Sequence, residues 1–223
     1  MTAPAPRALV FDWDNTLVDT WPVIGACLNA TLAAFGLPTW SDDEVQARVR
    51  ASARDSFPRL FGDRAEEAMA YYYETFEARH LERLAPLPGT QERLESLAAS
   101  GRYLAVVSNK RGDLLRREAV ALGWQGLFGA LVGATDTARD KPDPAPVEAA
   151  LAPAGLAASP EAVWFVGDAD IDLVCARRAR CLPVLLRAQA PAPGEFPEEA
   201  APARHFADLG SLWRDLAETG AAV

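Results

Sequence analysis

Two aspartates, Asp12 and Asp14, lie at the end of the apolar run in LVFDWDNTLVDT at residues 9–20. Like charges this close repel, so a folded chain normally separates them or supplies a counter-ion. A carboxylate can attack phosphorus to form an aspartyl-phosphate, which splits one difficult displacement into two easier ones. Because an anion then attacks an anion, the reaction requires a hard cation held by oxygen ligands, and Mg²⁺ suits that task. The pair therefore indicates phosphoryl-transfer chemistry around Mg²⁺, and the alternative is a solvated turn.

Three other stretches carry polar groups that fit the same chemistry, and they are VVSNK at 106–110, KPDP at 141–144 and GDADID at 167–172. Asp12, Ser108 and Asp168 each directly follow a short apolar run. If those runs are strands of one parallel sheet, their carboxyl ends meet at the edge where ligands bind in such folds. Asp168 would then join Asp12 and Asp14 in an acidic cradle for the cation.

Five short apolar runs can form that sheet. They are nearly continuous in hydrophobicity, as buried parallel strands are, and they span 8–11, 103–107, 130–133, 163–167 and 183–186. Helical patterns alternate with them at 90–100, 111–122, 144–154 and 171–180. This alternation predicts an α/β fold, a Rossmann-like parallel sheet flanked by helices. Near the C-terminus we expect an irregular loop at 187–204 and an amphipathic helix at 208–218.

The segment between the first two strands has helical periodicity and no convincing strand, which predicts an inserted all-helical cap domain at 18–86. The core domain then comprises 1–17 and 87–223. Within the cap, Ser41 and Glu44 fit a capping box at the start of one helix, and another helix is expected at 64–84.

The composition restricts the partners of the chain. At 223 residues, half of them hydrophobic, it can bury a substantial core. Its formal net charge of −9 argues against a nucleic-acid or anionic-membrane surface but permits a small phosphorylated ligand beside a metal. No secretory signal is visible and no apolar run approaches the roughly 18 residues of a membrane span, so we expect a cytoplasmic protein. Cys27, Cys175 and Cys181 are expected to be buried free thiols.

The four motifs, in their order and spacing, resemble the haloacid dehalogenase (HAD) superfamily over nearly the whole chain. They are most similar to its phosphatase branch with a helical C1-type cap after the first motif, and especially to phosphoglycolate phosphatase-like members. The dehalogenases hydrolyse a carbon–halogen bond without metal and lack the second aspartate, so Asp14 favours phosphate-ester chemistry. One departure from the family pattern is Arg180, near which a helix-ending glycine is usual; Arg in the left-handed conformation costs about 1 kcal/mol.

The resemblance implies a role for each matching residue. Asp12 would be the nucleophile and a metal ligand, and Asp14 the general acid and base, whose backbone carbonyl also binds the metal. Asp168 would be a direct metal ligand, and Asp172 would act on the metal through water or by supporting its direct ligands. The implied phosphate-binding groups are Thr16, Ser108, the Asn109 backbone N–H and Lys141.

Several residues of the core motifs also have simpler explanations. Ser108 and Asn109 could merely cap the helix that follows them. Lys141, before Pro142, could be an ordinary lysine in a surface loop. Lys110 stays open between the rim of the site and simple solvation.

In the cap, the segment at 48–62 lies where a substrate-reading loop is expected. Arg50 or Arg54 could clamp a carboxylate or second anionic group there, and Arg54 is the preferred candidate. The alternative is that these arginines solvate a helix end or pair with Asp55. His80 is expected to be a packed or partly exposed helical residue near Phe76.

These features predict a Mg²⁺-dependent phosphatase that hydrolyses a small phosphorylated metabolite, phosphoglycolate-like or a sugar phosphate, through an aspartyl-phosphate. A phosphomutase of the same fold (β-phosphoglucomutase-like) is the alternative among enzymes. A non-catalytic phospho-accepting regulatory domain also uses clustered aspartates, but such receivers are shorter and carry no helical insertion after the first strand; a catalytically inactive binding module is the remaining alternative. The choice between monomer and homodimer, and the identity of the substrate, are left open by the sequence.

Overall fold

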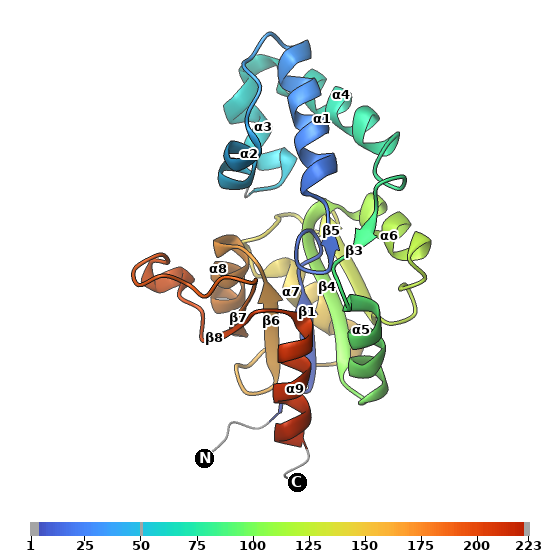
Figure 1. The fold of residues 1–223 in the computed structure, drawn as a ribbon, viewed down its shortest axis with the longest axis vertical. Helices are drawn as coiled ribbons and strands as arrows, with labels where there is room; N and C mark the ends of the chain where they lie inside the picture. The colour runs from blue at the N-terminus through green and yellow to red at the C-terminus, as the bar shows by residue number, and fades with distance from the viewer. Residues whose placement is uncertain (1–4, 50, 221–223) are drawn as a thin grey trace.

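A six-stranded parallel sheet forms the centre of the protein. The computed structural model describes residues 5–49 and 51–220 (Figure 1). The strand order is β5-β4-β1-β6-β7-β8, and every neighbouring pair is parallel. The strands are β1 (Ala8–Phe11), β4 (Tyr103–Arg111), β5 (Ala130–Ala134), β6 (Val163–Gly167), β7 (Leu182–Leu186) and β8 (Arg204–Phe206). The predicted α/β class is confirmed.

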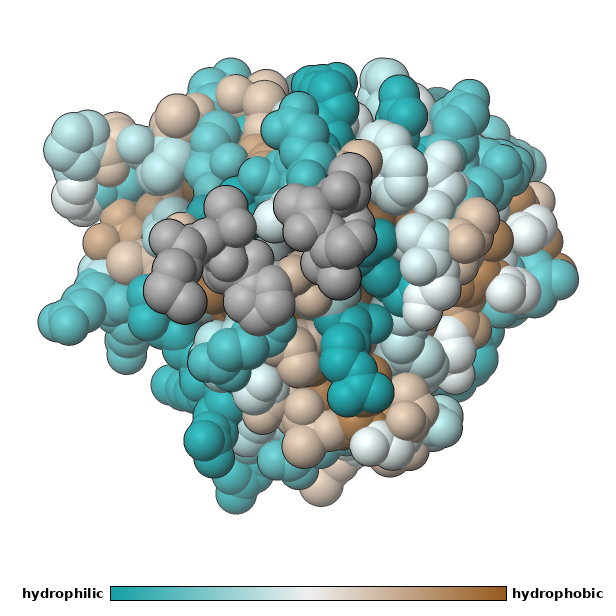
Figure 2. All heavy atoms as spheres, turned by 90° about the horizontal axis from the view of Figure 1, so that it is seen from below, coloured by the Kyte–Doolittle hydropathy of each residue, from teal (hydrophilic) through white to brown (hydrophobic). Residues whose placement is uncertain are grey.

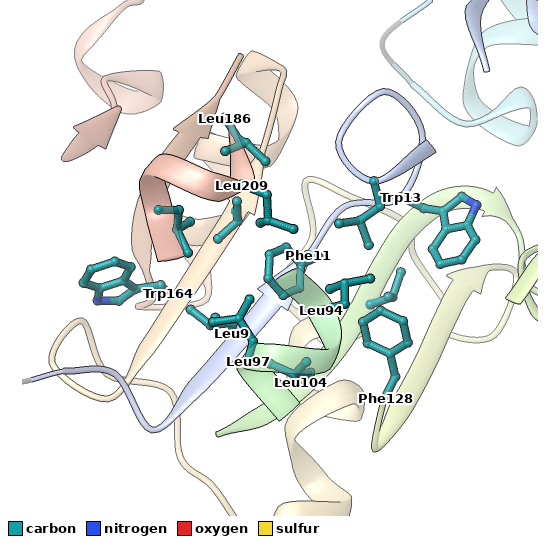
Figure 3. Packing of buried hydrophobic residues seen from close by; sticks show 14 of the residues in the cluster. Leu9, Phe11, Trp13, Leu94, Leu97, Leu104, Phe128, Trp164, Leu186 and Leu209 are labelled. Atoms are coloured by element: carbon teal, nitrogen blue, oxygen red, sulfur yellow. The ribbon is translucent and has the colours of Figure 1, made fainter. Parts of the chain in front are cut away.

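Helices cover both faces of the sheet because the side chains of each buried strand alternate between two apolar layers. Leu9 and Phe11 of β1 face α5 (Thr90–Ala99), α6 (Gly112–Ala121) and α9 (Leu209–Gly220), as Figure 3 shows for part of this layer. Ala8 and Val10 face α7 (Ala145–Leu151) and α8 (Asp170–Arg178). All four β1 residues are 0% exposed, which fixes the end of this strand, and hence Asp12, firmly in the core.

The all-helical insertion lies beyond one end of the sheet, at the top of Figure 1. It contains α1 (Trp21–Ala34), α2 (Asp42–Arg48), α3 (Ala53–Phe61), the short 3₁₀ turn η1 (Gly62–Arg64) and α4 (Ala65–Glu77). The predicted capping box is present: Ser41 Oγ accepts from the Glu44 N–H, and the Glu44 carboxylate accepts from the Ser41 N–H. The helical cap is therefore confirmed, whereas the limits 18–86, 1–17 and 87–223 stay a prediction.

A small antiparallel ribbon joins the insertion to the sheet domain. Its strands are β2 (Val18–Asp19) and β3 (Ala85–Pro86), which pair in the register Val18 to Pro86. The apolar pattern did not indicate these strands, because two residues are too few to show a period.

Two helices of the insertion differ from expectation. The expected loop at 48–62 is mostly the helix α3, which tolerates Pro58 in its interior. The helix expected at 64–84 ends at Glu77, after which residues 78–83 form turns. Figure 1 shows these turns leading from α4 back to the sheet domain.

Several smaller features complete the core domain. The loop predicted at 187–204 contains the 3₁₀ turn η3 (Glu198–Ala200), η2 (Ala152–Ala154) follows α7, and β8 was not expected. The three cysteines are free and buried, as predicted. Arg180, near which the resemblance implies a helix-ending glycine, has φ of 60° and therefore adopts the left-handed conformation.

The end of the molecule opposite the insertion is mostly hydrophilic, with small apolar patches (Figure 2). Among the described residues, no helix is both long enough and apolar enough to span a membrane.

Candidate active site

The predicted site residues meet at the carboxyl edge of the sheet. Asp12 follows β1, Ser108 and Asn109 belong to the last part of β4, and Asp168 follows β6. Lys141 reaches the same place from the loop between β5 and α7. A cavity of about 150 Å³ lies between this edge and the insertion, and both Asp12 and Lys141 line it.

Lys141 is the central cation of this edge. Its Nζ donates to Asp12 Oδ1 over 2.6 Å and to Asp172 Oδ1 over 2.7 Å, and the residue is 2% exposed. The reading of Lys141 as an ordinary surface lysine is therefore wrong. Burial acts to lower the pKa of Lys141, but the two carboxylates outweigh it and raise that pKa, so the ammonium stays charged.

Asp12, Asp168 and Asp172 form an acidic cluster. One carboxylate oxygen from each lies within 4.8 Å of the others. Asp172 is held by α8: its Oδ2 accepts from the Ala169 N–H over 3.1 Å. Gly167 makes room for it, because a Cβ at that position would lie 2.4 Å from Asp172 Cγ. The backbone at the end of β6 thus requires glycine so that Asp172 can reach the cluster.

The charges of this cluster are not balanced. Burial, followed by the neighbouring Asp172, Asp168 and Asp14, raises the pKa of Asp12 well above its ordinary value, even though Lys141 opposes the shift. Burial and Asp172 raise the pKa of Asp168 to about 7. A single lysine therefore does not neutralise the carboxylates, and a divalent cation among these hard oxygen donors would supply the missing charge.

The remaining predicted phosphate-binding residues border this cluster. Thr16 is 2% exposed and donates from Oγ1 to Asp168 Oδ1 over 3.0 Å. Asn109 holds the Lys141 loop with two hydrogen bonds: its Oδ1 accepts from the Lys141 N–H over 2.9 Å, and its Nδ2 donates to the Lys141 carbonyl over 3.2 Å. Ser108 Oγ accepts from the Lys110 N–H over 3.1 Å within β4. The N-cap of α6 is Arg111 and has no side-chain cap hydrogen bond, so the reading of Ser108 and Asn109 as mere helix caps is wrong.

Lys110 belongs to a second buried group next to the first. Its Nζ donates to Glu118 Oε2 over 2.6 Å and lies 2.6 Å from Asp14 Oδ1. The contact with Asp14 is an ion pair without the angles of a hydrogen bond, and Asp14 Oδ1 has no other partner. The charge attraction at this distance does not depend on those angles. Lys110 is 8% exposed, so simple solvation is wrong for this residue.

The insertion contributes the opposite wall of the cavity. This wall is mainly apolar and aromatic, with Trp21, Ile24, Phe57, Tyr72 and Phe76 among its lining residues. The side chains come from α1, α3 and α4, which pack on one another through the same apolar faces.

Arg54 binds the core domain instead of Asp55. It donates from Nε to Asp140 Oδ2 over 3.1 Å and from Nη2 to Oδ1, and Asp140 directly precedes Lys141. Arg54 is not among the residues that line the cavity, so its role as an anion clamp stays a prediction. Arg50, the other candidate, lies outside the described residues.

Three functional neighbours were not evident in the sequence. Glu118 is 1% exposed although it lies in the polar stretch LRREA, and His80, also 1% exposed, contacts it from the turn after α4. Asp140 gave no signal beyond its place before Lys141. His80 and Trp13 lie 38 and 105 residues from Glu118, and Arg54 lies 86 residues from Asp140, so no local pattern could reveal these contacts. Lys110, the third partner of Glu118, is only 8 residues away.

Comparison with known proteins defines the class. The family described as haloacid dehalogenase-like hydrolase matches residues 9–185, which include all four motifs. The chain belongs to this family, and it is an enzyme of the phosphoglycolate phosphatase-like branch that the motifs indicated.

Individual relatives agree with this class. A phosphoglycolate phosphatase of Aquifex aeolicus (strain VF5) is 33% identical over 177 residues, which cover 78% of this chain and 81% of the relative. The solved structure of a predicted phosphoglycolate phosphatase from Haemophilus somnus 129PT has a TM-score of 0.77 and 26% identity over 96% of this chain and 99% of that one. A haloacid dehalogenase-like hydrolase from Bacteroides fragilis, at 24% identity, shares the fold with a TM-score of 0.83 over 93% of this chain and 99% of that one.

Proposed function

We propose that this chain is a Mg²⁺-dependent phosphomonoesterase that hydrolyses a small phosphorylated metabolite through an aspartyl-phosphate at Asp12. The observation that carries the proposal is the charge imbalance of the acidic cluster, in which Asp12 and Asp172 share the ammonium of Lys141 and Asp168 lies beside them. Neither the phosphomutase nor the regulatory alternative is favoured by the relatives.

The donor set suits Mg²⁺, since it consists of carboxylate oxygens, from Asp12 and Asp168 after two central strands and from Asp172 in the first turn of α8. Asp12, Asp168 and the Asp14 backbone carbonyl would hold the ion, with Asp172 supporting them directly or through water. When bound, Mg²⁺ neutralises the negative charge that collects on the transferring phosphoryl group.

The chain's own residues then divide the reaction into two steps. Asp12 attacks phosphorus and forms an acyl-phosphate bond while the bond from phosphorus to the alcohol oxygen breaks. Asp14 gives its proton to that leaving oxygen, and afterwards takes a proton from the water that hydrolyses the acyl-phosphate. Lys141, Ser108, Thr16 and the Asn109 backbone N–H would bind the phosphoryl oxygens throughout.

Phosphoglycolate is the first substrate to test, because relatives such as the Aquifex protein are named for that activity. Hydrolysis would release inorganic phosphate from it, whereas a mutase would isomerise a sugar phosphate without releasing phosphate. A panel of sugar phosphates and nucleoside monophosphates extends the test to the other substrates that share the same core chemistry.

The variant Asp12→Asn tests the mechanism. We expect it to lose phosphatase activity by about 10⁴-fold or more, because an amide cannot act as the nucleophile. Phosphate release from phosphoglycolate and p-nitrophenyl phosphate is measured with Mg²⁺ and with EDTA, and the exposed Asp43→Asn serves as the matched control. Turnover that survives either Asp12→Asn or the removal of metal would refute the proposed mechanism.

A further inference from the structure

The group around Glu118 has no part in the chemistry proposed so far. We call Trp13, His80, Lys110 and Glu118 the Glu118 cluster. Each is at most 8% exposed, and they come from four places in the chain: the first motif, the turn after α4, the end of β4, and α6. A buried carboxylate is costly unless it is paired and hydrogen-bonded, so its presence in α6 needs an explanation.

Glu118 is held by three donors. Its Oε2 accepts from Trp13 Nε1 over 2.7 Å and from Lys110 Nζ over 2.6 Å, and its Oε1 lies 2.8 Å from His80 Nδ1. Burial acts to raise the pKa of Glu118, but the hydrogen bond with His80 and the charge of Lys110 outweigh it and lower that pKa. The carboxylate is therefore charged and fixed in one orientation.

Lys110 connects this fixed carboxylate to Asp14, the proposed general acid. The same ammonium lies 2.6 Å from Glu118 Oε2 and 2.6 Å from Asp14 Oδ1. Asp14 lines the cavity, and its side chain is 19% exposed. With Oδ1 held by Lys110, the other carboxylate oxygen of Asp14 is the one left to meet a substrate.

We propose that Glu118 is a positioning residue for the proton donor: it holds Lys110 against Asp14 and thereby fixes the oxygen of Asp14 that serves the leaving alcohol. This inference rests on the proposed phosphatase function. In the reaction, the proton on that Asp14 oxygen passes to the alcohol oxygen as its bond to phosphorus breaks and the bond from Asp12 to phosphorus forms. A misplacement of about 1 Å can cost on the order of 10²-fold in rate, so the support of Lys110 matters.

The experiment uses the dependence of an acid-assisted step on its leaving group. An alkoxide leaves poorly and needs the proton of Asp14, whereas p-nitrophenolate leaves well without it. The constant kcat/KM covers only the steps up to transfer of the phosphoryl group to Asp12, so it reports this proton transfer separately from the later attack of water. It is measured for p-nitrophenyl phosphate and for the best alkyl phosphate of the panel.

Glu118→Gln is the test variant, since the amide oxygen can still accept hydrogen bonds but no longer attracts Lys110 by charge. We expect kcat/KM to fall about 10²-fold for the alkyl phosphate and less than about 3-fold for p-nitrophenyl phosphate. In an Asp14→Asn background the same substitution should cost almost nothing further, because there is no proton donor left to position. Glu67→Gln, which removes the carboxylate of an exposed ion pair with Arg64, is the control and should change neither constant.

Equal losses for the two substrates would overturn the inference, as would full additivity with Asp14→Asn. If Glu118→Gln does not fold, Lys110→Gln takes its place, since that variant leaves Glu118 with Trp13 and His80, and it should show the same selective loss for the alkyl phosphate. Glu118→Asp, which keeps the carboxylate, should retain more of the alkyl phosphate activity than Glu118→Gln or Lys110→Gln. A wild-type protein that hydrolyses neither phosphate would refute the proposed function itself. An active wild type whose variant loses equally on both substrates would refute only the role of Glu118.

Discussion

The two buried lysines of the site, Lys141 and Lys110, lie in environments of opposite balance. Lys141 pairs with Asp12 and Asp172, which lie beside Asp168, and burial raises the pKa of Asp12 and of Asp168. Lys110 faces Asp14 and Glu118, and the donors around Glu118 lower the pKa of that carboxylate. The first group lacks positive charge until a cation binds, whereas in the second both oxygens of Glu118 already have donors without any ligand. The buried carboxylates that lack enough positive charge therefore mark the place where ligands bind. The carboxylate whose hydrogen-bond partners are all present, Glu118, marks a place where the protein positions a side chain.

The largest expected effect comes from removing the cation of the unbalanced group. Lys141→Met should lower the free energy of unfolding by about 3 kcal/mol without metal, because it leaves buried carboxylates without their partner. Mg²⁺ should recover part of this loss, since the ion replaces the missing charge. Urea denaturation with EDTA and with Mg²⁺ measures both.

Lys110→Met is the matched variant in the balanced group. It should also lower the free energy of unfolding, but Mg²⁺ should recover none of this loss, because Glu118 is not one of the carboxylates of the acidic cluster that would bind the metal. Equal recovery in the two variants would contradict the distinction between the groups.

A smaller effect is expected from pH. Asp168 has a pKa of about 7, above its ordinary value of 3.8, so the folded state holds this proton more tightly than the unfolded chain. The resulting stabilisation is present in full below the unfolded pKa and is lost as pH rises through 7. Between pH 6 and pH 8 the metal-free protein should therefore lose about 1.4 kcal/mol of unfolding free energy.

Thermal or urea unfolding in EDTA at the two pH values measures this loss. Asp168→Asn should remove it, and saturating Mg²⁺ should reverse it, because the metal binds the deprotonated carboxylate and does so more tightly at higher pH. A metal-free stability that rises from pH 6 to pH 8 by an amount that depends on Asp168 would show that the carboxylate is already neutralised by Lys141.

The smallest expected effect lies outside both groups. Arg180→Gly should raise the free energy of unfolding by about 1 kcal/mol, because glycine adopts the left-handed conformation at φ 60° without strain. Neither Mg²⁺ affinity nor kcat/KM should change, since Arg180 is exposed at the end of α8. A change in either would mean that a gain in stability alone alters metal binding or catalysis. The stability losses expected for Lys141→Met and Lys110→Met could then not be assigned to charge alone.

The sheet could be predicted from sequence because each of its central strands is buried on both faces. The runs at 8–11 and 163–167 match β1 and β6 residue for residue. The edge strand β8, in contrast, contains Arg204 and His205, and only Phe206 of its three residues is buried, so hydrophobicity alone did not indicate it. The early end of α4 was also missed, since the polar residues after Glu77 are compatible with either helix or turn.

The site divides in the same way. Asp12, Ser108 and Asp168 were found because each follows an apolar run, and the topology of a parallel sheet brings the carboxyl ends of such strands together. Glu118 could not be found, because a glutamate in an amphipathic helix usually faces solvent and two of its three partners, Trp13 and His80, lie far away in the sequence. Sequence therefore predicts the groups that the sheet aligns better than those that side-chain packing gathers.

The ribbon of β2 and β3 has a consequence for how this architecture can evolve. The chain leaves the sheet at Asp19 and returns at Ala85, and these two residues are direct partners in the ribbon. A short turn between them would close the chain without moving the strand ends that carry the catalytic residues. Apart from His80, which contacts Glu118, the intervening segment can thus be exchanged as a unit. A lineage could then acquire a new substrate range with a different cap while the catalytic residues of the sheet domain stay in place.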